Sequence, residues 1–266
     1  MPNPFLKWAG GKRWLVKSQF LPEIGSFFRY LEPFLGSAAM FFHMRPASAL
    51  LSDINPELIE TYKVIKESAQ SVLEVLYEHQ AAHNNSYYYK IRESLPQNPA
   101  ERAARFIYLN RTCWNGLYRV NRAGKFNVPI GTRSKVVLEY DNLEKIADAL
   151  LHAEIQVLDF KESIPVAEKG DFLFVDPPYT VQHNNNNFIK YNETIFRWSD
   201  QVELCDLLFS ARNRGVKIVL TNADHDSIRE LYRGFGTYIQ AERKSLLAAS
   251  ASRRCATSEA IFLANI

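Results

Sequence analysis

The sequence predicts an α/β fold with a mostly parallel sheet, because short apolar runs alternate with amphipathic helical patterns along most of the chain. The runs expected to form buried strands lie at about 30–34, 49–52, 155–158, 172–175, 217–220 and 260–264. A chain of 266 residues with 47% hydrophobic and 23% charged residues can bury a sizeable core. This composition excludes collagen, coiled-coil and disordered proteins, and we expect at most two folded parts.

Helical patterns fill the spaces between these strands. Pro56 follows Asn55, a typical N-cap residue, and opens an amphipathic segment. The apolar face expected for 201–212 consists of Val202, Leu204, Leu207, Leu208 and Ala211. Strand patterns are interrupted from 68 to 142, where helical patterns dominate and a hairpin-like segment turns at Ala123-Gly124. We therefore expect a discontinuous domain of 1–67 and 143–266, with a second domain inserted at 68–142.

Positive charge is concentrated in the inserted segment, although the net charge of the whole chain is only +3. The cations are Lys90, Arg92, Arg102, Arg105, Arg111, Arg119, Arg122, Lys125, Arg133 and Lys135. Against them stand only Glu93 and Glu101, so 90–135 carries +8 and the remainder −5. Aromatic rings are interleaved with these cations, as phosphate contact and base stacking require. We interpret the segment as a polyanion-binding face, although a solvated helical face is the common alternative for a charge run.

The sequence predicts a cytoplasmic protein with no membrane association and no metal site. Its apolar stretches are far shorter than the roughly 20 residues that span a bilayer, and its N-terminus does not resemble a secretory signal. Cys113, Cys205 and Cys255 lack metal-ligand or redox spacing, so we expect reduced thiols. The short asparagine run at 184–187 is expected to be a polar loop.

The apolar run 172–175 leads directly into Asp176-Pro177-Pro178-Tyr179. This order places a carboxylate at the carboxyl end of a buried strand, where open α/β sheets bind their ligands. A carboxylate and a proline carbonyl both accept hydrogen bonds, and a tyrosine ring can stack on a planar heterocycle. The motif therefore suits an amino group on a heterocyclic ring, although an ordinary strand-to-loop turn is the alternative.

Two further motifs suggest a nucleoside cofactor. The segment 30–37 leads from a strand to Gly36, which allows a ligand to approach the backbone. About 20 residues later, Asp53 ends the next strand, where a carboxylate typically holds ribose hydroxyls, although it could instead cap the following helix. The segment Lys7-Trp8-Ala9-Gly10-Gly11-Lys12 lacks phosphate-loop spacing, which disfavours nucleoside triphosphate binding.

With these motifs, the sequence resembles the Dam-type DNA adenine-N6 methyltransferases of the alpha group, or D12 class. In that family KWAGGK, EPFxG and DPPY motifs occur in this order, here at 7–12, 32–36 and 176–179. The resemblance covers nearly the whole chain, because Asn110-Arg111, 114–119, Asn121 and 124–129 match the family's target-recognition region. It implies the class I S-adenosylmethionine-dependent methyltransferase fold, with a seven-stranded, mostly parallel, Rossmann-like sheet. The inserted domain would then be a mainly helical target-recognition domain that carries a β-hairpin.

The resemblance also implies roles for individual residues. The cofactor-binding positions fall on Trp8, Lys12, Phe34, Gly36, Asp53, Asp159 and Asp176. The catalytic positions fall on Asp176, Pro177 and Tyr179. The DNA-binding positions fall on Lys7, Arg111, Trp114, Asn115, Leu117, Arg119, Asn121, Lys125, Asn127 and Pro129. Among these, Arg119 matches the guanine-reading arginine, Trp114 the wedge into the duplex, and Arg111 and Lys125 are read as phosphate contacts. One departure is Ala38, where many relatives have a second glycine.

These matches imply methyl transfer from S-adenosylmethionine to the N6 atom of a flipped adenine in double-stranded DNA, with GATC as the expected target. Asp176 and the Pro177 carbonyl would accept the two N6 hydrogens, and Tyr179 would stack on the base. Two alternatives stay open. They are cytosine-N4 methylation, a class that usually has serine in place of Asp176, and a non-catalytic DNA-binding regulator. The family also suggests a cognate restriction endonuclease as a partner, and we expect the free protein to be monomeric.

Overall fold

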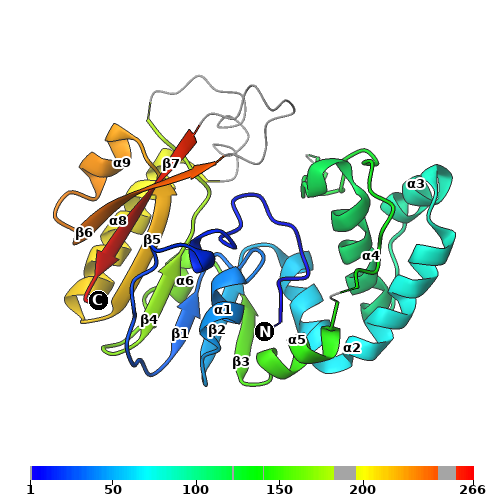
Figure 1. Cartoon of the computed structure of the whole chain (residues 1–266), viewed down its shortest axis with the longest axis horizontal. Coiled ribbons are helices and arrows are strands. Elements are labelled where there is room, and N and C mark those ends of the chain that lie inside the picture. Colours follow the sequence, from blue (N-terminus) through cyan, green and yellow to red (C-terminus); the bar gives the residue numbers. More distant parts are fainter. Residues whose placement is uncertain (1, 122, 140, 183–195, 245–255) are drawn as a thin grey trace. The chain divides into compact units, whose positions relative to one another are not determined.

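Seven strands form a single sheet in the order β3-β2-β1-β4-β5-β7-β6. The structure, a computed structural model, describes residues 2–121, 123–139, 141–182, 196–244 and 256–266. Figure 1 shows the elements along the chain. The β1–β4, β4–β5 and β2–β3 pairs are parallel, whereas β7 runs antiparallel to both β5 and β6. The predicted α/β class with a mostly parallel, seven-stranded sheet is therefore confirmed.

The chain divides by its internal contacts into two compact units. The first comprises 1–16 and 35–157, and the second comprises 17–34 and 158–266. The first contains α1 (Ala39–Met44), β2 (Ala49–Asp53), α2 (Pro56–Ala82), α3 (Asn85–Glu93), α4 (Pro99–Thr112), the short helix η2 (Trp114–Gly116), α5 (Leu143–Leu150) and β3 (Ala153–Val157). The expected insertion at 68–142 lies within this unit, and its boundaries stay a prediction.

Helix α2 begins as the sequence predicts. The Asn55 side chain accepts hydrogen bonds from the backbone N–H groups of Glu57 and Leu58, and Pro56 occupies the first helical position, where no N–H is needed. Ser68 has non-helical angles (φ −148°, ψ 46°) inside the helix. The first residue of the predicted insertion is therefore a kink within one long helix, because the chain bends there without leaving the helical pattern.

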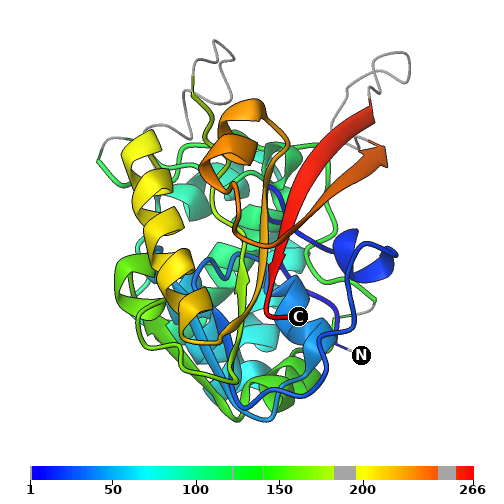
Figure 2. The ribbon, with the colours of Figure 1, turned by 90° about the vertical axis from the view of Figure 1, so that its left-hand side faces the viewer.

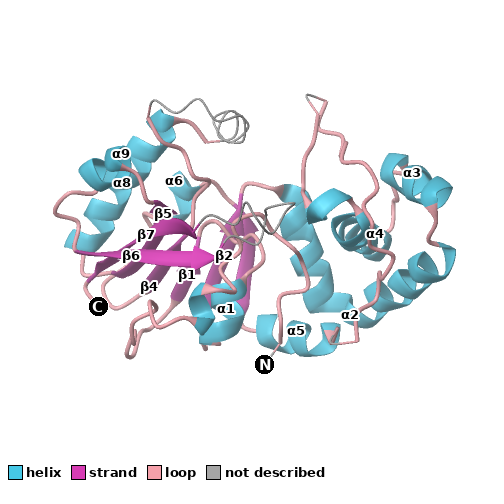
Figure 3. Cartoon of the chain, turned by 45° about the horizontal axis from the view of Figure 1, so that its top comes forward, coloured by secondary structure: helices cyan, strands magenta, loops and turns pink. Residues whose placement is uncertain are grey.

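From 56 to 121 the chain forms helices and loops, as Figure 3 shows. After η2 it turns back on itself through two isolated antiparallel bridges, Cys113 to Ile130 and Val120 to Phe126. The Asn121 side-chain oxygen accepts from the N–H groups of Ala123 and Lys125 and so holds the turn. The predicted hairpin thus has the expected turn, but bridges stand in place of continuous strands.

The second unit contains η1 (Leu15–Lys17) in part, β1 (Tyr30–Glu32), α6 (Phe160–Ser163), β4 (Phe172–Val175), α8 (Trp198–Asn213), β5 (Lys217–Ala223), α9 (Asp226–Leu231), β6 (Thr237–Lys244) and β7 (Ala256–Ala264). Strand β1 ends earlier than predicted, because Pro33 cannot donate a ladder hydrogen bond. Figure 2 shows β6 and β7 side by side. Strand β6 was not predicted, because polar residues interrupt its apolar ones, whereas the expected strands were continuous apolar runs.

Helix α8 covers the predicted segment 201–212 and begins three residues earlier. Leu204, Leu208 and Ala211 are buried as expected, whereas Val202 is 38% exposed. The prediction for Val202 is wrong because Gln201, and not Val202, lies on the buried face of the helix. Gln201 is fully buried and forms hydrogen bonds with Tyr232 (2.7 Å) and Asn222 (3.1 Å). A polar side chain with buried partners can therefore take a core position that hydrophobicity assigns to its neighbour.

Candidate active site and DNA interface

The turn after β1 is held to the end of β2 through the backbone of Gly36. Its N–H donates to Oδ2 of Asp53 (3.2 Å), and its carbonyl accepts from the Tyr62 hydroxyl (3.0 Å). The other carboxylate oxygen, Oδ1, accepts from the N–H of Asn55 (3.0 Å). Since Asn55 itself caps α2, the alternative that Asp53 is the helix cap is wrong. Asp53 instead fixes the geometry of the glycine turn.

Burial raises the pKa of the Asp53 carboxyl above its ordinary value. Backbone hydrogen bonds from Asn55, Gly36 and Ile54 oppose this shift, because they stabilise the carboxylate. The residue as a whole is half-buried. A desolvated carboxylate of this kind can accept hydrogen bonds from the hydroxyl groups of a ligand in addition to those from its three backbone donors.

Gly36 lies directly against Trp8 and has a left-handed backbone (φ +47°). A Cβ at this position would lie 2.7 Å from Cδ1 of Trp8, a distance that side chains do not tolerate. The indole also stacks on Tyr118 (5.7 Å between ring centroids, 22°) and more distantly on Phe106 (6.4 Å, 25°). Trp8 therefore links the glycine turn to Phe106 and Tyr118 within the first unit.

Lys12 is almost completely buried, with 2% of its surface exposed, and its Nζ donates to the Gly10 carbonyl (2.6 Å). Ala38 has a left-handed backbone (φ +53°) at the position where the resembling family often has glycine. Its N–H donates to the Leu35 carbonyl (2.8 Å), so the turn keeps the glycine-like conformation although the side chain disfavours it. The departure at Ala38 therefore changes the side chain and leaves the turn in the left-handed form.

In the second unit, two predicted cofactor residues lie at the start of α6. Phe34 is half-buried and stacks on Phe160 (5.6 Å, 24°). Asp159 is the N-cap of α6: its Oδ1 accepts from the N–H of Lys161 (2.9 Å), and its own N–H donates to Glu162 (3.0 Å). This capping box gives Asp159 a structural role that the sequence pattern did not assign.

Asp176 lies where β4 ends, as predicted, and is half-buried. Its Oδ1 accepts a hydrogen bond from the Thr221 hydroxyl (2.7 Å). Thr221 is fully buried and lies on β5, which pairs in parallel with β4. The neighbouring strand therefore fixes the orientation of the carboxylate, and the sequence analysis missed Thr221 because nothing distinguishes it within an apolar strand.

The Tyr179 hydroxyl donates to Oε2 of Glu259 (2.6 Å), which fixes the ring. Burial raises the pKa of Tyr179 well above its ordinary value, and the negative charges of Asp176 and Glu259 raise it further. The phenol thus stays a hydrogen-bond donor at neutral pH. Glu259 was also missed, although an acidic residue directly before the apolar run 260–264 was a usable indication; in the structure it is 2% exposed.

The predicted DNA-binding segment is largely accessible. Trp114 is 51% exposed, and Asn115, Arg119, Lys125 and Pro129 are also exposed. Leu117 and Asn127 are half-buried, and Asn121 is exposed but holds the turn. The Arg119 Nε donates to Oδ1 of Asn127 (2.8 Å), which directs the guanidinium. The Lys7 backbone is paired with the Asn110 side chain through both its N–H (2.9 Å) and its carbonyl (2.7 Å).

The structure contradicts the prediction that Arg111 contacts phosphate. Its side chain is 3% exposed and forms an ion pair with Asp141, whose side chain is also 3% exposed. Further guanidinium hydrogen bonds reach the carbonyls of Phe5 (3.0 Å) and Val136 (2.6 Å). Arg111 therefore joins three separate segments of the first unit and offers no surface charge.

Cys113 and Cys205 are buried free thiols, and burial raises the pKa of Cys113 to about 11 and that of Cys205 to about 12. Both are thus poor nucleophiles at neutral pH. Arg122, Cys255 and the asparagine run at 184–187 lie outside the described residues. Across the described ranges, no group of His, Cys, Asp and Glu side chains is arranged to hold a metal ion. In that same part of the chain, no helix is long and apolar enough to cross a membrane.

Comparison with known proteins agrees with this arrangement. The chain is 34% identical over 253 residues to the Type II methyltransferase M1.LlaDCHI of Lactococcus lactis subsp. cremoris, covering 91% of this chain and 88% of that protein. It is 34% identical over 237 residues to the DNA adenine methylase of Vibrio cholerae O395, covering 86% of this chain and 84% of that protein. Against the DNA N-6-adenine-methyltransferase of Escherichia phage P1, 35% identity covers 88% of this chain but 31% of that protein. A family model also matches residues 8–246, and the chain belongs to the D12 class of N6 adenine-specific DNA methyltransferases.

Proposed function

We propose that this protein transfers a methyl group from S-adenosylmethionine to the N6 atom of an adenine flipped out of double-stranded DNA, within the sequence GATC. The observation that carries the proposal is the half-buried Asp176 carboxylate at the end of β4, oriented by Thr221 and followed by a proline carbonyl and Tyr179. These groups offer two hydrogen-bond acceptors beside an aromatic ring. An exocyclic amino group on a flat base meets that arrangement.

The residues of the first unit fit a nucleoside cofactor. The Asp53 carboxylate lies beside the Gly36 turn, against which Trp8 packs, and it can accept hydrogen bonds beyond those from its backbone donors. We assign ribose binding to Asp53 and further cofactor contacts to Trp8, Lys12, Phe34 and Asp159. S-adenosylmethionine supplies, when bound, a methyl group on a positively charged sulfur.

Asp176 and the Pro177 carbonyl are proposed to accept the two N6 hydrogens. This concentrates the lone pair on nitrogen and stabilises the positive charge that develops there during attack. Tyr179 would hold the base by stacking, with its ring fixed by the bond to Glu259. Because Thr221 already orients the Asp176 carboxylate, this side chain needs little reorganisation when the base binds.

Base recognition is assigned to the exposed segment after η2. Arg119 is proposed to read guanine: with Nε held by Asn127, its Nη groups form the fork that matches O6 and N7. Trp114 would wedge into the duplex, and Lys125 would contact phosphate. Asn115, Leu117, Pro129 and Lys7 are proposed to complete the contacts to bases. The domain at 68–142 would then act as the target-recognition domain.

The activity is tested with purified protein, labelled S-adenosylmethionine and duplexes that contain or lack GATC. Mass spectrometry of the digested DNA should find N6-methyladenine only in GATC duplexes, whereas N4-methylcytosine would overturn the choice of base. Asp176→Ala should lower turnover at least 10²-fold, the usual scale for losing one preorganised electrostatic contact. Asp206→Ala, which removes an exposed acid on α8, is the matched control and should leave turnover unchanged.

Sequence selectivity is tested separately with affinities for GATC and singly substituted duplexes at several salt concentrations. Arg119→Ala should lose roughly 1–3 kcal/mol of discrimination at one guanine. Lys125→Ala should instead weaken binding to every duplex and reduce the salt dependence. If the Arg119 variant loses the same affinity for all duplexes, Arg119 contacts the DNA backbone and does not read a base. Cofactor binding without any methylated product would favour the non-catalytic alternative.

A further inference from the structure

The side chain of Tyr118, the residue directly before Arg119, anchors the segment after η2. Its ring packs against Trp8 (5.7 Å between centroids), Phe106 (5.3 Å) and Phe126 (5.9 Å). Phe106 and Phe126 are buried, and Tyr118 itself is half-buried. Arg119, by contrast, is exposed. The chain that carries the proposed guanine-reading side chain is therefore attached to the first unit by the residue next to it.

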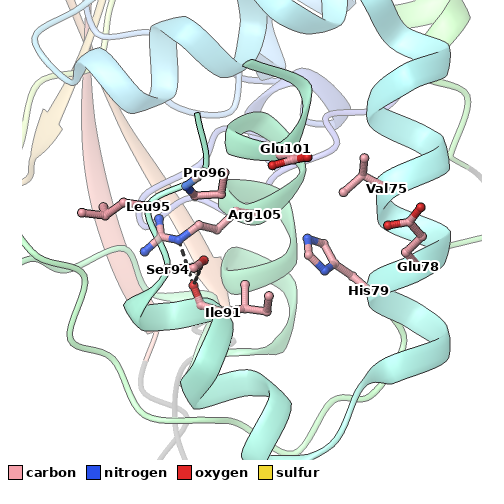
Figure 4. A pocket seen from close by; sticks show the side chains of 9 residues that line it. All are labelled: Val75, Glu78, His79, Ile91, Ser94, Leu95, Pro96, Glu101 and Arg105. Carbon is pink, nitrogen blue, oxygen red and sulfur yellow. Dashed lines mark hydrogen bonds between the residues drawn. The ribbon is translucent and has the colours of Figure 1, made fainter. Parts of the chain in front are cut away.

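Helix α2 holds the hydroxyl of Tyr118. This hydroxyl donates to Oε2 of Glu57 (2.7 Å), and the N–H of Glu57 donates to Oδ1 of Asn55, the N-cap of the helix (3.1 Å). The other carboxylate oxygen of Glu57 lies 4.0 Å from Nη1 of Arg105. Arg105 is itself held, because its Nε donates to the Ile91 carbonyl (2.9 Å), as Figure 4 shows. Backbone and side-chain contacts thus restrain the Glu57 carboxylate beside Tyr118.

Side-chain anchors matter in this segment because it has little regular strand pairing. Among its described residues, isolated bridges stand in place of a continuous ladder. The Arg119 carbonyl accepts from the N–H of Asn127 (3.1 Å), and the Arg119 Nε donates to the Asn127 side chain (2.8 Å). These bonds join Arg119 to the returning chain, whereas Tyr118 joins both to α2. A bidentate contact to guanine requires the guanidinium to be placed within about 0.5 Å and 10–20°.

We propose that Tyr118 and Glu57 form a positioning pair for base recognition, in which their hydrogen bond sets the direction of Arg119 toward the DNA. The inference rests on the proposed reading of guanine by Arg119 and adds two residues to which no contact with DNA or cofactor is assigned. The stacking of Tyr118 on Trp8 is a separate contact, which a phenylalanine ring would keep. Loss of the hydroxyl should therefore lower selectivity and leave cofactor binding unchanged.

The test compares affinities for the preferred duplex and for duplexes with one guanine replaced, so that the result does not depend on methyl transfer. Tyr118→Phe should lower discrimination at the guanine read by Arg119 by about threefold or more, a part of the roughly 5- to 150-fold that one bidentate contact supplies. Glu57→Ala should have the same effect. Glu57→Gln keeps an acceptor oxygen and should retain most of the discrimination. Calorimetry should find the same affinity for S-adenosylmethionine in Tyr118→Phe as in the wild type.

Glu60→Ala is the matched control. Glu60 lies about one turn further along α2 and pairs with Arg102 (2.5 Å), so its loss removes a comparable contact away from Tyr118. This variant should keep full discrimination. In a protein that already carries Arg119→Ala, Tyr118→Phe should remove no further discrimination, because the two changes act through the same side chain. A further loss there would overturn the positioning pair.

Three other results would also overturn it, and they separate the pair from the proposed function. If Arg119→Ala leaves discrimination unchanged, the reading of guanine by Arg119 is wrong and the pair is refuted with it. If Arg119→Ala removes discrimination but Tyr118→Phe and Glu57→Ala do not, guanine reading stands and the pair alone is refuted. If Glu60→Ala lowers discrimination as much as Glu57→Ala, the Glu57 contact only stabilises the fold.

Discussion

The contact between Gly36 and Trp8 gives a prediction whose size can be worked out from the structure. In Gly36→Ala, placing alanine in the left-handed conformation lowers the free energy of unfolding by about 1–2 kcal/mol. Alanine also restricts the unfolded chain, which raises the free energy of unfolding by about 0.4–1 kcal/mol. The new Cβ would also lie 2.7 Å from Cδ1 and 3.1 Å from Nε1 of Trp8. Since Trp8 is stacked on Tyr118, it cannot move without loss, and overpacking of this kind costs about 1–3 kcal/mol. We expect a net destabilisation of about 3 kcal/mol.

Gly124→Ala is the matched control. Gly124 is also left-handed (φ +72°), but a Cβ there would meet nothing within 4 Å. Its replacement should therefore cost only the backbone difference, about 1 kcal/mol. Chemical denaturation of both variants measures the two free energies of unfolding. Calorimetry should find S-adenosylmethionine binding weakened in Gly36→Ala and unchanged in Gly124→Ala.

The reasoning is refuted if both alanine variants lose the same stability, because the contact with Trp8 would then contribute nothing. The double variant Gly36→Ala with Trp8→Leu provides a second check. A smaller side chain at position 8 makes room for the Cβ, so the two changes should be clearly non-additive. Additive losses would mean that the alanine acts through the backbone alone.

Three further predictions concern single side chains. Asp53→Ala should weaken cofactor binding about ten- to 150-fold, the value of a hydrogen bond to a charged group, and unchanged calorimetry would limit Asp53 to holding the glycine turn. Arg111→Ala should lower the free energy of unfolding by about 3–5 kcal/mol because Asp141 is left buried and unpaired, and a loss below 1 kcal/mol by denaturation would contradict its burial. Thr221→Val should reduce turnover about tenfold with cofactor affinity unchanged, since one donor to Asp176 is lost, and normal turnover would show that the hydroxyl does not orient the carboxylate.

The fold was predictable where the local residue types are compatible with few kinds of secondary structure. A short apolar run such as 172–175 that leads directly into a proline turn favours a buried strand, and a proline after asparagine favours a helix start. Strand β6 escaped prediction because it contains no continuous apolar run, and among the described strands it pairs with β7. Its pairing depends on a distant segment, which local sequence does not specify.

The groups that orient the candidate catalytic residues were harder to find than those residues themselves. Asp176 and Tyr179 occur in a recognisable motif, whereas Thr221 and Glu259 contact them from strands that are 45 and 80 residues away in sequence. Thr221 has no local pattern of its own, and Glu259 is distinguished only as an acidic residue directly before an apolar run. A motif therefore locates the reacting atoms, while the residues that fix their geometry depend on sheet register.

Charge counting failed for a related reason, because a count cannot tell a surface cation from one inside an ion pair. Arg102 pairs with Glu60 (2.5 Å), Arg105 bonds to two carbonyls, and Arg111 is buried against Asp141. Each phosphate contact contributes about 0.9 to the slope of log affinity against log salt concentration. Removing these three from the candidate phosphate contacts lowers the largest slope that the basic segment could produce by about 2.7. Under the proposed function, the salt dependence of DNA binding should therefore come from the exposed cations of this segment, such as Arg119, Lys125 and Arg133.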